Sequence, residues 1–210
     1  TIDRKRKYEL PNGSAVPSVT TILDATKPRE EREALANWKK RVGETQAQQI
    51  STEAANVGTI MHKNLELYIE SHERKVGSNV IHQKAYNMSN VIIAEGLRNV
   101  SEIYGTEVSL YYEGLYAGTT DCVGLWKGNL AILDFKQTNK PKKKEWISNY
   151  FCQLAAYAMA HNEMFDTDIK TGVVLMCSRD LGYQEFVIEG EEFEEAANHW
   201  NKRVEQYYNL

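Results

Sequence analysis

The chain contains little cysteine, and its three cysteines are far apart. Cys122, Cys152 and Cys177 form no C-x-x-C pair. This spacing excludes a zinc knuckle and a disulfide framework, and it favours a reducing compartment. Each thiol is most simply interpreted as a small buried hydrophobic group.

Long hydrophobic runs are absent as well. No stretch approaches the ~20 apolar residues that a membrane-spanning helix needs, and no secretory signal occurs at the start. We therefore expect no membrane partner. The 210 residues, of which 42% are hydrophobic and 26% charged, are enough for one domain with its own core. We expect a single domain over residues 1–210, with a helical part at about 17–103 and a sheet core at about 105–210.

An excess of positive charge is the third missing feature. The formal net charge is −4, which does not by itself indicate a nucleic-acid-binding protein. Residues 136–144 nevertheless hold five lysines without an acid, while residues 185–195 hold six glutamates without a base. A focused basic strip can bind phosphate in an acidic protein. A solvated loop fits the charge equally well, but the strip directly follows a charged strand end, which favours a functional role.

Aromatic residues flank this lysine strip. Trp146, Tyr150 and Phe151 follow it directly and could stack on nucleobases, although aromatic side chains on a helix more often pack in the core. The residues that we expect to contact nucleic acid are Lys140, Lys142, Lys143, Lys144 and Trp146.

Hydrophobic periodicity and turn signals predict helices and strands along the whole chain. Ser18 or Thr20 is expected to cap the first helix. Helices are expected at 17–23, 28–41, 51–71, 79–100, 144–162 and 191–208, and strands at 106–113, 115–127, 130–136, 168–177 and 183–188. This order predicts an α/β or α+β sheet with a helix between strands. A basic segment, 4–7, precedes these elements and is either disordered or in contact with a polyanion.

Three charged residues lie on two strands that a tight turn would join. Gly128-Asn129 is a two-residue hairpin signal, and this turn would place Asp121 opposite Lys136. Because side chains alternate between strand faces, Asp121, Asp134 and Lys136 would share one face, with the two carboxylates roughly 7–8 Å apart at the backbone. One divalent cation could bridge them and hold a phosphate. An exposed Asp121–Lys136 ion pair of little stability is the alternative.

Two pairs of polar residues at helical spacing could complete such a site. His62 and Glu66 share a face of the third predicted helix and offer one nitrogen and one oxygen to a metal. A capped surface histidine, beside a glutamate paired with a neighbouring lysine, is the alternative. Gln153 and Tyr157 share a face of the helix after the lysines, where they either orient a phosphate or a catalytic lysine or pack in the core.

Four short motifs follow one another along the chain: His62, Gly118-x-x-Asp121, Asp134-x-Lys136 and Gln153-x-x-x-Tyr157. This ordered set resembles the PD-(D/E)XK nuclease superfamily, in its RecB-like branch. Longer segments, among them 17–23, 58–66 and 133–141, resemble the mitochondrial genome maintenance exonuclease family, so the resemblance covers most of the chain. D-x-K alone is a common pattern, whereas the ordered set is specific.

The resemblance implies a restriction-endonuclease-like core, with a central mixed sheet flanked by helices and a site for Mg²⁺ or Mn²⁺. The implied metal ligands are His62, Asp121, Asp134, the backbone carbonyl of Phe135 and, in a supporting role, Glu66. The implied catalytic residues are Asp121, Asp134, Lys136, Gln153 and Tyr157, with Lys136 orienting or activating the attacking water. Glu107 matches an acid that related proteins carry before the first hairpin strand.

The resemblance also implies an activity. We expect a Mg²⁺- or Mn²⁺-dependent DNA exonuclease that prefers single-stranded ends, in the cytoplasm of a bacterial or phage-infected cell or, for an organellar protein, in the mitochondrial matrix. The three scattered cysteines rule out the iron–sulfur cluster of some relatives. Since helicase motifs are absent, a helicase, polymerase or recombination partner would be a separate chain. The alternatives are a structure-specific or double-strand endonuclease on the same fold and a non-catalytic DNA-binding subunit.

Overall fold

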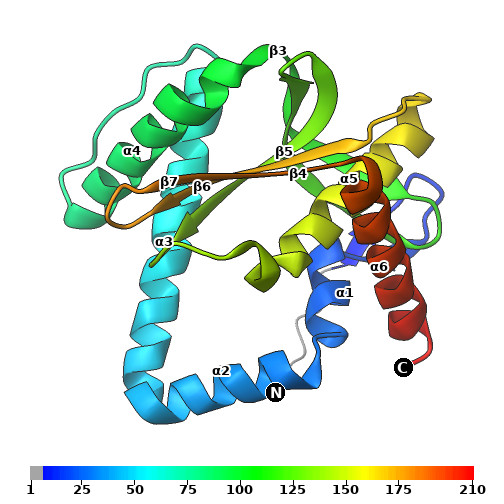
Figure 1. Ribbon diagram of the computed structural model, residues 1–210, viewed down its shortest axis with the longest axis horizontal. Helices are drawn as coiled ribbons and strands as arrows, with labels where there is room; N and C mark the ends of the chain where they lie inside the picture. Colours follow the sequence, from blue (N-terminus) through cyan, green and yellow to red (C-terminus); the bar gives the residue numbers. More distant parts are fainter. Residues whose placement is uncertain (1–6) are drawn as a thin grey trace.

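A mixed sheet in the order β3-β4-β5-β6-β7 organises the computed structural model, which describes residues 7–210 (Figure 1). Residues 4–6 of the basic segment lie outside the described residues. The strands are β3 (Val100–Tyr112), β4 (Tyr116–Trp126), β5 (Asn129–Thr138), β6 (Thr171–Ser178) and β7 (Tyr183–Glu189). β5 and β6 run parallel, and the other neighbours are antiparallel. The expected α/β fold with a mixed sheet flanked by helices is confirmed.

Helices cover both faces of the sheet, and alternating strand residues supply the two cores. On one face, α3 (Glu44–Ile69) and α4 (Val80–Val91) pack on Cys122, Leu133 and Phe135. On the other face, α1 (Val19–Ala25), α5 (Ser148–Phe165) and α6 (Gly190–Tyr208) pack on Val123 and Ile132 (Figure 1). Within the described residues, every helix is too short or too polar to cross a bilayer.

The helix α5 connects the parallel strands β5 and β6. A parallel pair requires such a crossover, because a tight turn can join only antiparallel strands. Small residues on α5 allow the close approach, since Ala155, Ala156 and Ala158 are fully buried against the sheet. A Cβ on Gly172 of β6 would lie 2.9 Å from the Leu154 Cβ, so glycine is needed at that contact.

Several boundaries differ from the sequence prediction. α3 begins at Glu44 rather than at residue 51. The prediction missed this first part of the helix because only Ala47 is buried there, so the apolar pattern starts later. α4 ends at Val91 and continues as a π-helical turn (Ile92–Gly96) and a 3₁₀ turn (Leu97–Asn99), so the sheet begins at Val100. The short strands β1 (Lys7–Glu9) and β2 (Ala15–Pro17) were not predicted, because three residues carry too little pattern.

The predicted hairpin turn was wrong by one residue. Lys127 and Gly128 form the turn, with φ of 47° and 90°, and Trp126 pairs with Asn129. A two-residue turn of this kind needs positive φ at both central residues. Lys127 therefore has a left-handed backbone conformation that is unfavourable for a residue with a side chain, and Asn129 is the first residue of β5. The register moves by two residues, so the paired residues of β4 and β5 keep their predicted faces. Continued by one residue, this register places Asp121, instead of Val123, level with Asp134.

The helix α2 (Arg29–Val42) joins α1 to α3 away from the sheet (Figure 1). The helix predicted for 28–41 begins one residue later, directly after Pro28, and acids occupy its first turn. None of its residues is buried. α2 is therefore held by its two ends rather than by a core.

Candidate active site

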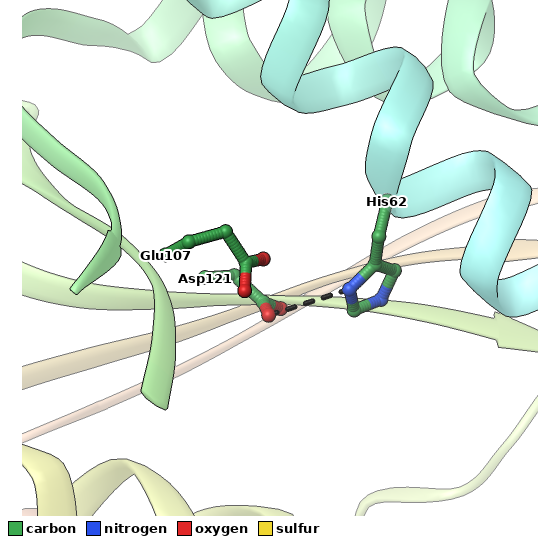
Figure 2. A group of neighbouring side chains, drawn as sticks. All are labelled: His62, Glu107 and Asp121. Carbon is green, nitrogen blue, oxygen red and sulfur yellow. Dashed lines mark ion pairs between the residues drawn. The ribbon is translucent and has the colours of Figure 1, made fainter. Parts of the chain in front are cut away.

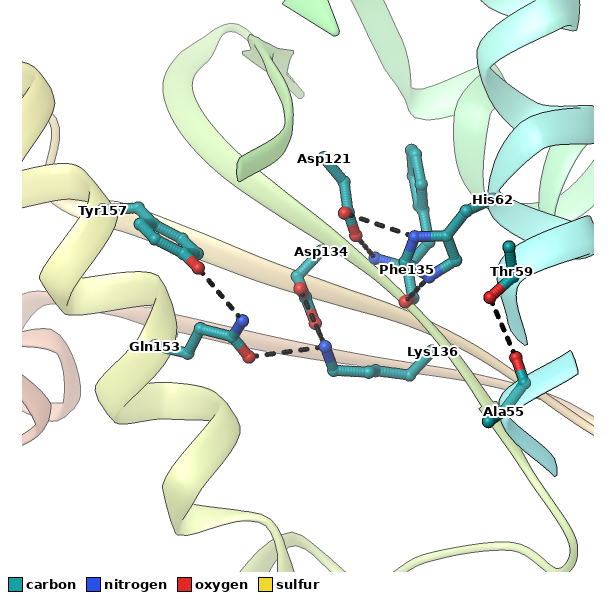
Figure 3. Close-up of polar contacts among 9 residues, drawn as sticks. All are labelled: Ala55, Thr59, His62, Asp121, Asp134, Phe135, Lys136, Gln153 and Tyr157. Carbon is teal, nitrogen blue, oxygen red and sulfur yellow. Dashed lines mark hydrogen bonds and ion pairs between the residues drawn. The ribbon is translucent and has the colours of Figure 1, made fainter. Parts of the chain in front are cut away.

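The central sheet divides at the predicted site. β4 pairs with β5 only from Cys122 to Trp126, and its preceding residues pair with β3 and, at Ala117, form a bridge with Ser18. β5 meanwhile stays paired with β6 as far as Thr138. The backbone beyond Leu133 therefore loses its β4 partner, and the Asp121 carboxylate replaces that strand. Its Oδ2 accepts a hydrogen bond of 2.7 Å from the Phe135 N–H (Figure 3).

His62 reaches this division from α3. Its Nδ1 lies 3.3 Å from Asp121 Oδ1, and its Nε2 donates to the Phe135 carbonyl at 2.7 Å. Burial lowers the pKa of His62, but the hydrogen bond and charge of Asp121 outweigh it and raise that pKa. Burial likewise opposes ionisation of Asp121, yet His62, Lys136 and the Phe135 N–H together lower its pKa. The two side chains thus stabilise each other in the charged form.

Glu107 completes a three-residue cluster that can hold a metal ion. It lies on β3 between residues that pair with Thr120 and Cys122, and so faces Asp121. Ligand atoms of His62, Glu107 and Asp121 all lie within 4.8 Å of one another (Figure 2). Glu107 has φ of 48°, a left-handed conformation that is costly within a strand and is often retained at functional sites. Burial, followed by the charge of Asp121, raises its pKa.

A second group of contacts joins β5 to α5. Lys136 Nζ donates to Asp134 Oδ1 at 2.9 Å and to Gln153 Oε1 at 3.3 Å, and Gln153 Nε2 donates to the Tyr157 hydroxyl at 3.3 Å (Figure 3). Burial raises the pKa of Asp134 to about 6 even though Lys136 opposes this effect. Burial disfavours the Lys136 ammonium, but the charges of Asp134 and Asp121 raise its pKa. Lys136 is therefore an ammonium at neutral pH.

The three charges predicted on one strand face form two neighbouring pairs. Asp121 pairs with His62, whereas Lys136 pairs with Asp134, 2.7 Å from Oδ2. The Asp121–Lys136 ion pair of the alternative interpretation is not formed. Glu66 pairs with Lys63 at 2.9 Å and lies outside the metal-ligand cluster, as its own alternative interpretation anticipated.

The glycine of the Gly118-x-x-Asp121 motif has a steric role in the structure. A Cβ at Gly118 would lie 2.8 Å from Tyr157 Cε1 and 2.9 Å from the Tyr157 hydroxyl. Tyr157 is only 4% exposed, so its ring is surrounded by other protein groups. Gly118 therefore makes room for the tyrosine that ends the Lys136–Gln153–Tyr157 chain.

Gly118→Ala is accordingly expected to displace Tyr157, to cost roughly 1–3 kcal/mol of stability and to lower any activity that depends on Lys136. Urea unfolding and cleavage rates would measure the two effects. The double variant Gly118→Ala/Tyr157→Ala serves as the control, because without the ring the added methyl group meets nothing. If the two substitutions are additive, the steric explanation is wrong.

A cleft of about 500 Å³ gives access to these residues between α1, α3, β5 and α5. His62, Phe135, Lys136 and Gln153 all line it, so both groups of contacts face the same space. Its α3 wall is made of small residues, Ala54, Ala55 and Gly58.

The predicted lysine strip occupies the loop between β5 and α5. Gln184 holds this loop through two hydrogen bonds of 2.8 Å with the Lys142 backbone. Trp146 is 62% exposed, with the Lys143 ammonium 5.3 Å from its ring, so it does not pack in the core. Lys140 is exposed, whereas Lys144 pairs with Glu192 on α6 and lines a different pocket. The loop thus presents Lys140, Lys142, Lys143 and Trp146, and turns Lys144 away from the cleft.

No protein-family model matches the chain. The chain is similar to three proteins named mitochondrial genome maintenance exonuclease 1. The identity is 29% with that of Mus musculus, 27% with that of Homo sapiens and 26% with that of Xenopus tropicalis, over 80%, 80% and 83% of this chain. Among solved structures, one from Eubacterium rectale superposes with a TM-score of 0.49 at 13% identity, over 73% of this chain and 68% of that one.

The similarity to the three exonucleases extends over only part of those proteins. The aligned residues make up 51%, 50% and 51% of the mouse, human and frog chains. The chain therefore spans about half the length of the curated relatives it matches.

Proposed function

We propose that this chain is a metal-dependent DNA exonuclease of the PD-(D/E)XK type, which hydrolyses phosphodiester bonds at single-stranded ends. The observation that carries the proposal is the pairing of two groups on one divided sheet. One group, His62, Glu107 and Asp121, offers metal ligands, and the other fixes the Lys136 ammonium against Asp134. The exonuclease names of the relatives support the same reaction class.

The residues present fit a hard divalent cation. Glu107 and Asp121 offer carboxylate oxygens, Phe135 a backbone carbonyl and His62 an imidazole nitrogen, a mainly oxygen set that suits Mg²⁺ or Mn²⁺. Asp134 is proposed as a further ligand through its buried Oδ2, which lies 2.7 Å from the Lys136 ammonium and accepts no hydrogen bond from the described residues. A cation bound there would neutralise phosphate charge and acidify the attacking water.

The protein groups have separate roles in this proposal. Lys136 is protonated at neutral pH, so it cannot take the proton of the attacking water. Its positive charge instead stabilises hydroxide over water. The same charge stabilises the negative charge that develops on the phosphate during the reaction. Gln153 also accepts a hydrogen bond from the ammonium that Asp134 holds, and Tyr157 in turn accepts one from Gln153.

The size of the cleft and the charges around it support a single strand as the substrate. A cleft of about 500 Å³ has the size of a small-molecule pocket, so it suits a nucleotide-sized part of one strand rather than a duplex. A second hollow at the junction of α1 and α2 shares Asp24 and Lys27 with the cleft and continues past Arg32 and Lys39. Basic side chains beside a cleft can bind the phosphate backbone of a strand that enters it. For the location of the protein, the word mitochondrial in the name of the relatives supports the mitochondrial matrix over the bacterial or phage-infected cell.

The proposed function is tested with end-labelled linear single strands, duplexes and covalently closed single-stranded circles. Linear single strands should be degraded with Mg²⁺ or Mn²⁺, the circles should resist, and EDTA should abolish cleavage. Cleavage of circles and linear strands at equal rates would indicate the endonuclease alternative. Binding of DNA without cleavage in either metal would indicate a non-catalytic DNA-binding subunit.

A further inference from the structure

Most polar side chains of the cleft are already engaged with other protein groups. Lys27 pairs with Asp24 at 3.2 Å. Asn149 donates to Glu31 at 3.1 Å and accepts from Arg203 at 3.0 Å. These groups therefore already have partners within the fold.

Two cleft residues are not engaged in this way. The amide oxygen of Gln137 is buried and has no hydrogen-bond partner among residues 7–210; this atom only accepts hydrogen bonds, so it cannot bind a phosphate oxygen. The Tyr150 hydroxyl forms no hydrogen bond with any residue of the described range 7–210. Unlike Gln137 Oε1, a phenol can donate, and burial raises the pKa of Tyr150 so that the proton is retained.

Tyr150 also lies beside the catalytic candidate Lys136. The Lys136 ammonium is 5.0 Å from the centroid of the Tyr150 ring, a cation–π distance. The ammonium covers this ring face, which is consequently closed to a stacked base. The hydroxyl remains as the group that Tyr150 can offer to a ligand in the cleft.

We propose that Tyr150 is a substrate-contacting residue whose hydroxyl donates a hydrogen bond to a non-bridging oxygen of the phosphate held beside Lys136. The proposal rests on the proposed nuclease function. A phosphodiester oxygen carries negative charge and only accepts hydrogen bonds, so it matches a free phenol donor. The Lys136 ammonium, already shared between Asp134 and Gln153, supplies charge, and Tyr150 supplies direction.

Tyr150→Phe tests this contact because it removes only the hydroxyl. Hydrogen bonds to charged acceptors typically correspond to about a tenfold or larger change in rate, so cleavage of linear single strands should fall about tenfold. Tyr207→Phe on α6, outside the cleft, is the matched control and should cleave at the wild-type rate. Wild-type cleavage by Tyr150→Phe would overturn the proposal.

A phosphorothioate substrate separates contact from structure. One linkage carries sulfur at either non-bridging position, and both diastereomers are assayed in Mn²⁺. Because sulfur is a weak acceptor, the effect of Tyr150→Phe should shrink to about twofold or less for one diastereomer and persist for the other. An equal loss on all three substrates would indicate a merely structural role for the hydroxyl and overturn the contact.

The outcome for wild-type protein keeps the two proposals distinct. If the wild-type protein cleaves DNA and Tyr150→Phe cleaves it at the same rate, the proposed Tyr150–phosphate contact is wrong and the proposed nuclease function stands. If the wild-type protein cleaves no nucleic acid, the proposed function fails. Binding of a thymidine oligonucleotide in Ca²⁺ then decides about the contact: weaker binding by Tyr150→Phe but not by Tyr207→Phe supports it, and equal binding overturns it.

Discussion

Asp121→Ala is expected to lower DNA cleavage by about a thousandfold or more, because a metal-ligand carboxylate supports several kcal/mol of transition-state stabilisation. The same substitution should destabilise the metal-free protein by roughly 1–3 kcal/mol. Asp121 accepts a hydrogen bond from the Phe135 N–H and pairs with His62 Nδ1, and alanine would remove the partner of both atoms at the division of the sheet.

The stability effect of Asp121→Ala should depend on pH with a defined sign. The folded-state pKa of Asp121 lies below its ordinary value of 3.8, so its stabilisation is present at neutral pH and is lost as the pH falls through the folded pKa. The wild-type and variant unfolding curves should therefore converge in acid. Urea unfolding in EDTA at pH 7 and in acid measures this difference.

The matched control is Asp168→Ala. Asp168 is an exposed aspartate in a surface ion pair with Lys170, and its loss should change stability by less than about 0.5 kcal/mol and leave cleavage unchanged. Wild-type cleavage by purified Asp121→Ala would contradict the assignment of Asp121 as a ligand. Loss of cleavage by Asp168→Ala as well would point to a general defect.

Those elements of the fold that have strong local signals could be predicted from the sequence. Ser18 caps α1 by accepting from the Thr21 N–H at 3.0 Å, and Asn79 caps α4 in the same way. The approximate strand positions followed from apolar runs between turn residues. The start of α3 could not be predicted, because its residues are mostly exposed and so show no helical repeat of hydrophobic residues.

The structure brings His62, Asp121, Asp134 and Lys136 near one another, but in pairings that differ from the prediction. A turn one residue earlier than expected set the register, and the departure of β4 from β5 turned Asp121 towards His62 rather than Lys136. Glu107 was noted only through the resemblance, since positive φ within a strand has no signal in residue type. The pairing of β3 with β4, once known, would have placed Glu107 opposite Asp121.

Asp134→Asn is expected to abolish cleavage as completely as Asp121→Ala but to stabilise the metal-free protein at alkaline pH. Burial raises the folded-state pKa of Asp134 to about 6 from an ordinary value of 3.8. The folded state therefore binds more protons than the unfolded state between these values, and this group makes stability fall as pH rises through about 4 to 6. Asparagine mimics the protonated form, so the variant should gain as much as roughly 1–3 kcal/mol at pH 8.

Unfolding in EDTA at pH 4.5 and pH 8 measures this gain, which should be small at the lower pH and large at the higher. Added Mg²⁺ should stabilise the wild-type protein at pH 8 far more than Asp134→Asn, because a ligand of the folded state raises stability only where its site is intact. A variant less stable than wild type at pH 8 would mean that the Lys136 ion pair outweighs burial. The expected result would mean that the ionised Asp134 carboxylate destabilises the metal-free protein. Its role would then be to offer a negative charge to a bound cation.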